Sequence, residues 1–141
     1  MLGAIAQLWF STERRRFSVA SLNLWVRAPV RLGQIAVTLD ANGRWEGYVT
    51  WAYLTAASAQ QMVHMDPPFL HDSDWNEGDQ LWIIDVFAQP GAVRRVVRHA
   101  RSTLSARFNV AHRVLRDGTG RIVGQRSLRL RTGEAIPDEA V

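Results

Sequence analysis

Apolar residues recur at helical spacing in four segments of the chain and alternate or run together in five others. We expect helices at residues 3–10, from Ser18 until Pro29 ends the second helix, at 55–65 and at 92–106. We expect strands at residues 35–39, 45–54, 81–88, 108–116 and 121–131, and a hairpin turn at Asp40-Ala41-Asn42-Gly43 between the first two. This order predicts an α+β fold in which a mixed or antiparallel central sheet is flanked by helices.

Two segments carry patterns that relate them to the sheet. Residues 81–88 are mostly apolar and rich in isoleucine and valine, which is typical of a central strand buried on both faces. In residues 92–106 the expected inner stripe consists of Val93, Val96, Val97 and Leu104, and arginines cover the other faces. We therefore expect a single domain over residues 1–131. The remaining residues, 132–141, offer little to bury and are expected to form a flexible tail.

Composition excludes several kinds of chemistry. The 141 residues include no cysteine, so disulfides, thiolate metal sites and iron–sulfur clusters are excluded. All 17 basic residues are arginine, and without lysine the chain has no Schiff-base or P-loop chemistry. The four histidines lack the spacing of a zinc site, so we expect no metal. No stretch approaches the roughly 20 apolar residues of a membrane span, and the start lacks a basic leader, so a cytoplasmic protein is expected.

Charge is distributed unevenly along the chain. Residues 94–131 hold eleven arginines and one acid, whereas residues 45–93 hold no arginine and six aspartates and glutamates between 66 and 85. Such a split predicts one electropositive face suited to an acidic partner. Nucleic acid, anionic lipid and acidic protein all fit this charge. Most of the six tryptophans lie outside the arginine-rich half, which disfavours the stacking of nucleic-acid bases.

Two positions are candidates for chemistry. Asp85 lies inside an apolar strand, where a carboxylate is costly unless it is paired or faces a cavity. It is therefore either a general base or the partner of one of the many arginines. Gly91 begins the arginine-bearing helix, and a strand–turn–helix junction exposes backbone N–H groups that can bind phosphate. The glycine is equally explained by the geometry of the turn.

The order of several motifs resembles that of the RTX toxin-activating lysine acyltransferases, or hemolysin-activating proteins. The resemblance runs from about residue 2 to about residue 123. The matching pieces, in chain order, are Leu8-Trp9 with the Ser/Thr and arginine segment after it, the pair of strands around Asp40 and Tyr48, Trp51-Ala52-Tyr53-Leu54, Asp74-Trp75-Asn76-Glu77-Gly78-Asp79 and Trp82-Ile83-Ile84-Asp85. The Asp-Trp-x-x-Gly-Asp box, followed three residues later by an aromatic strand that ends in aspartate, is the most specific of them.

This resemblance implies a GNAT-like acyltransferase fold, a homodimer and a reaction in the cytoplasm. It implies transfer of a fatty acyl group from acyl carrier protein to internal lysines of a secreted RTX-type protoxin. In the family a histidine and the strand aspartate share proton transfer and oxyanion stabilisation, and Asp85 matches the aspartate. Alignment from Leu8-Trp9 places Arg15 at the histidine position, whereas alignment backward from Ser18-Val19 places Arg14 there. Arginine is no base at neutral pH, but it can bind an oxyanion or a phosphate.

Three functions follow from these observations. The first is a divergent acyltransferase in which Asp85, with a repositioned histidine such as His64, deprotonates the acceptor lysine. The phosphopantetheine thioester of acyl carrier protein is then the donor, with Gly91 at its phosphate. The carrier is expected to dock on the four arginines of the 92–106 helix, Arg94, Arg95, Arg98 and Arg101. The second is a catalytically silent relative that binds the carrier or a secreted partner. The third, a nucleic-acid binder, lacks a base-reading motif, so no nucleic-acid partner is expected.

Overall fold

The computed structural model describes residues 1–65, 69–117 and 121–131, and it confirms the α+β fold. The elements are α1 (Leu2–Phe10), the 3₁₀ helix η1 (Glu13–Arg16), α2 (Val19–Trp25), α3 (Arg27–Leu32), β1 (Ile35–Leu39), β2 (Trp45–Leu54), α4 (Ala56–His64), β3 (Gln80–Ala88), α5 (Val93–Leu104), β4 (Val110–Arg116) and β5 (Ile122–Arg129). The strands form one five-stranded sheet in the order β1-β2-β3-β4-β5. Neighbouring strands are antiparallel except β3 and β4, which are parallel, so the sheet is mixed.

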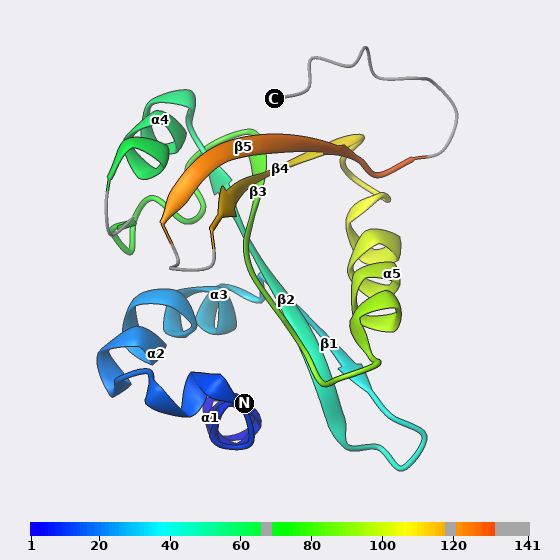
Figure 1. Ribbon diagram of the computed structural model, residues 1–141. Helices are drawn as coiled ribbons and strands as arrows, with labels where there is room; N and C mark the ends of the chain where they lie inside the picture. The colour runs from blue at the N-terminus through cyan, green and yellow to red at the C-terminus, as the bar shows by residue number, and fades with distance from the viewer. Residues whose placement is uncertain (66–68, 118–120, 132–141) are drawn as a thin grey trace.

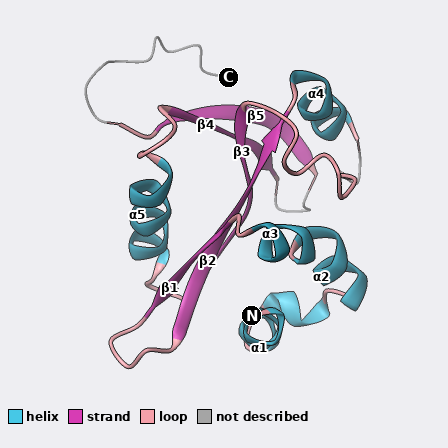
Figure 2. Cartoon of the chain, turned by 180° about the vertical axis from the view of Figure 1, so that it is seen from behind, coloured by secondary structure: helices cyan, strands magenta, loops and turns pink. Residues whose placement is uncertain are grey.

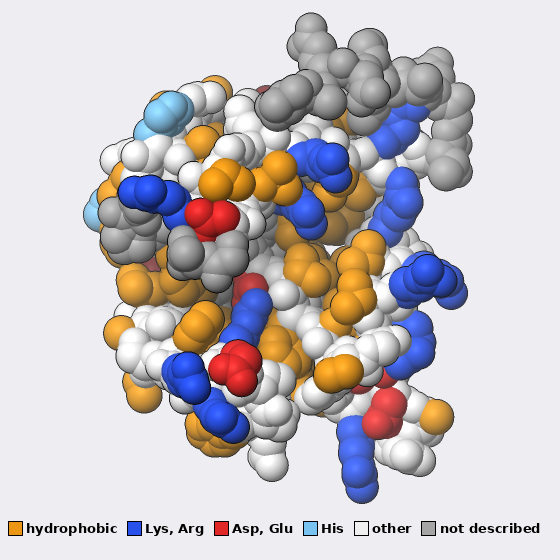
Figure 3. Space-filling model, viewed as in Figure 1, with side chains coloured by type: hydrophobic (Ala, Val, Ile, Leu, Met, Phe, Trp, Pro, Cys, Tyr) orange, Lys and Arg blue, Asp and Glu red, His pale blue; other side chains and the backbone are white. Residues whose placement is uncertain are grey.

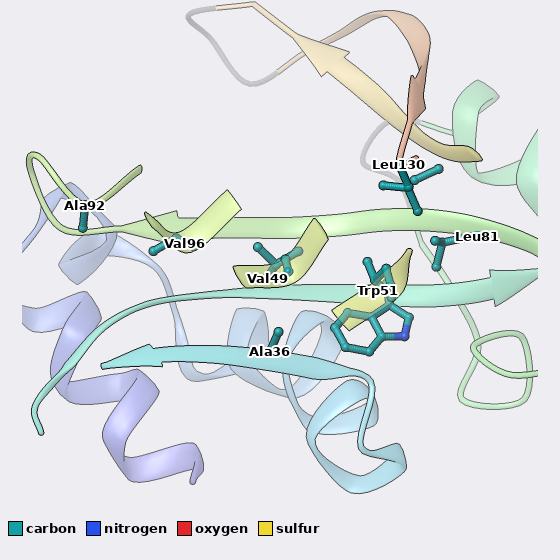
Figure 4. Close-up of a cluster of buried hydrophobic side chains, with 10 residues drawn as sticks. Ala36, Val49, Trp51, Leu81, Ala92, Val96 and Leu130 are labelled. Atoms are coloured by element: carbon teal, nitrogen blue, oxygen red, sulfur yellow. The ribbon is translucent and has the colours of Figure 1, made fainter. Parts of the chain in front are cut away.

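Helices cover both faces of the sheet. Helix α5 lies on one face, and α1 to α4 lie on the other (Figures 1 and 2). On the α5 side the buried cluster includes Val49 and Trp51 of β2 and Val96 of α5 (Figure 4). On the opposite side, Tyr48 packs with α1, and Ala52 packs in the cluster that includes α4. The alternation of β2 side chains thus builds both halves of the core.

Helix α5 contacts the sheet through a narrower stripe than the sequence predicts. Its buried residues are Val96, Ala100 and Leu104, spaced four apart, while Val93 and Val97 are 55% and 46% exposed. The prediction that these two valines face inward is therefore wrong. Only one ridge of the helix meets the sheet, and it lies so close that a Cβ on Gly47 would be 2.5 Å from Val96 Cγ2. The two valines are left beside the arginines on the outer surface.

The second helical segment is also divided differently from the prediction. Ser18 caps α2 through its side chain, as expected, but Pro29 lies within α3 rather than ending a helix. Proline is tolerated there because the backbone nitrogens of a helix's first turn have no intrahelical acceptor. The predicted stop at residues 66–68, the loop tip at 118–120 and the tail at 132–141 lie outside the described residues. No helix in the described ranges is long and apolar enough to span a membrane.

The two parallel strands separate along their length. In the described chain β3 and β4 pair at Trp82↔His112 and Ile83↔Arg113. Beyond Ile83, β3 continues beside β2 while β4 turns away with β5 (Figure 1). The space-filling view shows this face hollowed between α5 and the N-terminal helices, with apolar side chains along the hollow (Figure 3). Asp85 lies in this separated half of β3.

Candidate active site

An extra residue in β3 sets the direction of Asp85. Thr50 of β2 pairs with Asp85 and Trp51 pairs with Ile83, so Ile84 is the additional residue of a β-bulge. Ile83 packs on the α5 side of the sheet. Strict alternation would send Asp85 to that same side, two residues later. The bulge reverses this direction and presents the carboxylate to η1 on the opposite face, which is the kind of reorientation that bulges produce beside functional sites.

The carboxylate of Asp85 is paired with Arg14 of η1. Nη1 of Arg14 donates to Oδ2 at 2.6 Å, and Nη2 donates to Oδ1 at 2.8 Å. The same two nitrogens donate to the Tyr48 hydroxyl at 3.3 Å and to the Val86 carbonyl at 3.1 Å. Tyr48 in turn donates to Asp85 Oδ2 at 3.0 Å and accepts from Trp9 Nε1 at 2.8 Å. Both carboxylate oxygens are therefore occupied by internal donors.

Aromatic rings surround the Arg14 guanidinium. Its Cζ lies 5.5 Å from the ring centroid of Trp9, 5.9 Å from that of Phe17 and 5.3 Å from that of Phe87. These distances are within the range of cation–π attraction. The side chains of Arg14 and Asp85 remain 24% and 17% exposed, so the ion pair is partly buried and opens to solvent on one side.

Burial and charge fix the protonation of the groups around this ion pair. Burial alone would lower the pKa of the Arg14 guanidinium, but its hydrogen bonds and attraction to Asp85 outweigh burial and raise that pKa. Burial, together with the negative charge of Asp85, raises the pKa of the Tyr48 hydroxyl well above its usual value. Tyr48 therefore stays protonated at neutral pH and acts as a hydrogen-bond donor. Thr50 is fully buried on the adjoining strand, and its Oγ1 has no hydrogen-bond partner among the described residues.

The other predicted catalytic residues lie elsewhere. Arg15 follows Arg14 on η1 but is exposed, and Arg14 rather than Arg15 reaches the aspartate. A 3₁₀ helix turns by about a third of a revolution per residue, so neighbouring side chains point in different directions. His64 ends α4, is exposed, and places Nδ1 2.7 Å from the carbonyl oxygen of Gln60 in its own helix. The structure does not bring Arg15 or His64 into contact with Asp85.

The four arginines predicted as a docking surface divide into two pairs. Arg95 makes a bidentate ion pair with Glu46, at 2.8 Å for each bond, and Arg101 donates to the carbonyls of Arg129 and Leu130. Within the described residues the side chains of Arg94 and Arg98 make neither an ion pair nor a hydrogen bond, and both are exposed. The positive side chains follow the edge of the molecule formed by α5 (Figure 3).

Gly91 precedes α5 in a left-handed conformation. Its φ is +82°, which an L-residue adopts only with strain, so glycine is required by the turn itself. It is exposed, and the helix begins two residues later at Val93. The turn geometry accounts for the glycine, and its role toward a phosphate stays a prediction.

A pocket of about 630 Å³ lies between α1 and the end of the β1–β2 hairpin. It is lined by Ala4, Gln7, Leu8, Phe10, Ser11, Arg44, Trp45 and Gln89. Leu8 and Trp45 belong to the same apolar cluster as Tyr48 and Phe87 of the ion-pair site. The pocket and the ion-pair site thus share this apolar cluster, although none of the residues bonded to Arg14 lines the pocket.

Sequence reasoning missed two features of this site. Trp9 and Tyr48 lie in pieces that the resemblance matched, but no local pattern predicts that they meet Phe17 and Phe87 around Arg14, because these residues come from separate segments. The apolar run around Ile84 likewise contains no pattern that predicts the β-bulge. One signal was present: the alignment backward from residues 18–19 places Arg14 at the position that faces Asp85.

Comparison with known proteins agrees with the motifs. The profile of the RTX toxin acyltransferase family (HlyC) matches residues 1–125. The chain is 32% identical over 126 residues to the RTX-II toxin-activating lysine-acyltransferase ApxIIC of Actinobacillus pleuropneumoniae, which covers 87% of this chain and 78% of the relative. It is 39% identical over 88 residues to the protein-lysine palmitoyltransferase CyaC of Bordetella bronchiseptica, which covers 62% of this chain and 46% of the relative. The CyaC of Bordetella parapertussis matches to the same extent.

Proposed function

Because this chain belongs to the RTX toxin acyltransferase family, we propose that it transfers a fatty acyl group from acyl carrier protein to lysine side chains of an RTX-type protoxin. The observation that carries the proposal is the Asp85 carboxylate, which a β-bulge turns toward η1 and which remains partly open to solvent. The proposed setting is the cytoplasm, where acyl carrier protein is available, and the proposed assembly is a homodimer.

The reaction requires a proton acceptor. A lysine amine has a pKa near 10.4, so only about 1 in 2,500 is neutral at pH 7. The acceptor ammonium loses one proton to solvent and a second to Asp85 as its nitrogen attacks the thioester carbonyl. The C–N bond forms and the C–S bond breaks. Asp85 then returns its proton to the departing thiolate, which leaves an amide and a free thiol.

Asp85 can accept a proton only when Arg14 has moved from its carboxylate, since both oxygens are engaged in the present arrangement. The released guanidinium keeps its charge and has donors for the oxyanion that develops on the thioester carbonyl. We assign proton transfer to Asp85 and charge stabilisation to Arg14. Arg15 and His64 are given no role in this scheme, because they lie away from the carboxylate.

The separated half of β3 supports an extended donor arm and a GNAT-like arrangement. The backbone N–H of Gln89 donates to the carbonyl of Glu46 on β2. In an antiparallel ladder every second residue bonds to the neighbouring strand, so the backbone N–H and C=O of Val86, three residues from Gln89, point away from β2. They face the side from which β4 has diverged, and the Val86 carbonyl is bonded there by Arg14. An extended phosphopantetheine arm can pair with this edge, and the apolar pocket beside α1 is the proposed place for the fatty chain.

Helix α5 supplies the proposed surface for the carrier. Val93 and Val97 are exposed beside Arg94 and Arg98, which have no partner among the described residues. An apolar ridge flanked by free guanidinium groups suits an acidic amphipathic helix such as acyl carrier protein presents. Arg95 and Arg101 contribute positive potential, but their donors are already engaged within the chain.

The test is an acyl-transfer assay with purified protein, palmitoyl-loaded carrier and a lysine-bearing protoxin fragment, read by mass spectrometry. The chain has no lysine of its own, so no acyl-lysine adduct can arise from self-modification, and peptide mapping assigns each adduct to the protoxin fragment or the carrier. Adducts that vanish with Asp85→Asn support the proposal. Adducts formed equally by that variant remove Asp85 from the mechanism.

A second candidate is favoured by the ion pair itself. Arg14 uses four of its five N–H donors on Asp85, Tyr48 and Val86. A carboxylate that is permanently held in this way is what we expect in a relative that binds the carrier but transfers no acyl group. The same assay separates the two, because the silent relative retains the carrier complex and forms no adduct.

A further inference from the structure

We infer that the rings of Trp9, Phe17 and Phe87, together with the Asp85 carboxylate, form a binding site for alkylammonium and guanidinium groups, and that Arg14 is its displaceable internal occupant. We call these four groups the cation cage. That the cage binds a small cation is independent of acyl transfer. That the acceptor lysine is the cation which displaces Arg14 rests on the proposed function.

The cage has the chemistry of a cation receptor. Three ring faces lie within 5.3–5.9 Å of the guanidinium carbon, and the carboxylate supplies a full negative charge. Two more oxygens, the Tyr48 hydroxyl and the Val86 carbonyl, accept from the same guanidinium. Attraction from aromatic faces increases when the cation is desolvated. These groups recognise positive charge and N–H donors rather than arginine as such.

Apart from the Arg14 side chain, few contacts hold the η1 segment against the sheet. Every η1 residue is at least partly exposed, and Glu13 and Arg16 have side chains that are more than three-quarters exposed. The guanidinium is therefore the main anchor of η1 on the sheet. Withdrawing it requires no part of the core to be opened.

Exchange of the Arg14 guanidinium for another cation costs less free energy than withdrawal of Arg14 alone. An unpaired Asp85 would be left partly buried and without a counter-charge, which is costly. A lysine ammonium entering as Arg14 leaves keeps the charge of the cage balanced and has three donors for the same acceptors. The cage thus couples exposure of the carboxylate to arrival of a cationic side chain.

The second bidentate pair in the structure provides a matched control. Arg95 also makes two hydrogen bonds to its carboxylate, from Nε and Nη2 to the two oxygens of Glu46, but the Arg95 side chain is 59% exposed. Among the described residues, no aromatic ring lies over its guanidinium. Removal of Arg95 uncovers a carboxylate without a cage, so it separates the contribution of the rings from that of charge.

The experiment measures binding of ethylguanidinium and ethylammonium to Arg14→Ala by calorimetry and by thermal shift, with neutral N-ethylurea as the ligand control. We expect both cations to bind Arg14→Ala about tenfold more tightly than they bind the wild type or Arg95→Ala, and to raise its melting temperature. N-ethylurea should do neither, and Arg14→Ala combined with Asp85→Asn should lose the binding. Equal binding to all the proteins, or equal effects of the cations and the urea, overturns the inference.

Failure of Arg14→Ala to fold in buffer is also informative. If ethylguanidinium restores folding and N-ethylurea does not, the cage binds the cation selectively, which supports the inference. If no compound restores it, Arg14→Gln is tested in the same way, and equal responses to cation and urea overturn the inference. The experiment uses no thioester, so its result is independent of whether the protein transfers an acyl group.

Discussion

The energy of the Arg14–Asp85 pair can be measured by a double-mutant cycle. Asp85→Ala leaves the Arg14 guanidinium with the Tyr48 and Val86 oxygens and removes its two bonds to a carboxylate. Breaking a fully buried ion pair costs about 3–5 kcal/mol. With side chains 24% and 17% exposed, solvent screening reduces this to about 2–3 kcal/mol. We expect a fall in melting temperature of about 10 °C for a chain of this size.

Arg14→Ala is expected to cost a similar amount, because it leaves Asp85 without a counter-charge and removes the contacts with three rings. The double variant removes both charges together and should be more stable than the sum of the single losses, with a coupling of about 2 kcal/mol. Urea and thermal unfolding followed by circular dichroism give the four free energies.

The corresponding cycle on Arg95 and Glu46 is the control, because that pair is also bidentate but has an exposed guanidinium. Its coupling should be the smaller of the two. The reasoning is refuted if the Arg14 and Asp85 losses are additive within about 0.5 kcal/mol. Additivity would mean that the two side chains lie near each other without stabilising the fold as a pair.

Three further predictions follow from the same structure. Arg14→His should transfer acyl groups faster than Arg14→Gln, because both variants lack the guanidinium assigned to the oxyanion and only histidine places a base beside the aspartate. Arg15→His, at an exposed position, should leave the wild-type rate unchanged; equal rates for Arg14→His and Arg14→Gln would contradict the placement. Arg94→Glu combined with Arg98→Glu should weaken carrier binding in low salt by about tenfold or more. Charge reversal of an arginine on β5 is the control, and an unchanged affinity of the α5 variant would exclude α5 as the docking surface. Hydrogen bonds from its arginine partner lower the pKa of Glu46, so this pair stabilises the fold above the ordinary glutamate pKa of about 4.3 and the contribution is lost as the pH falls below it. Acid unfolding of Glu46→Gln should accordingly be less steep between about pH 5 and pH 3, and an unchanged profile would show that the pair contributes nothing to it.

Much of the fold could be predicted because its signals are local. The turn at residues 40–43 and the alternation around it identify β1 and β2, and the apolar run ending near residue 88 identifies the central strand. The side-chain cap at Ser18 marks where α2 begins. Each of these features depends on residues within a few positions of one another, so a single sequence contains them.

The site could be predicted only in part, because its geometry depends on distant segments. Asp85 was identifiable as a carboxylate in an apolar strand, and pairing with an arginine was one of its two expected states. Which arginine could not be decided, since Arg14 and Arg15 differ only in the direction that a short 3₁₀ helix gives them. The bulge at Ile84 depends on the register with β2, which composition does not encode.

The inward prediction for Val93 and Val97 was wrong for a related reason. Helical periodicity identifies an apolar side but not how wide a stripe the sheet will cover. The close approach of α5 to Gly47 restricts contact to the ridge through Val96 and Ala100. The two exposed valines then become part of a surface, and this role is visible only once the packing is known.

The most direct test of the central claim, that the cation cage over Asp85 is the acceptor-amine site of an acyltransferase, is the intact mass of Arg14→Lys after incubation with palmitoyl-loaded carrier. The wild-type chain has no lysine, so it gives the background, and Arg95→Lys places an amine beside a carboxylate outside the cage. We expect one palmitoyl group on Arg14→Lys, mapped to position 14, and none on the other two proteins. Unmodified Arg14→Lys, or equal modification of Arg95→Lys, would contradict the account.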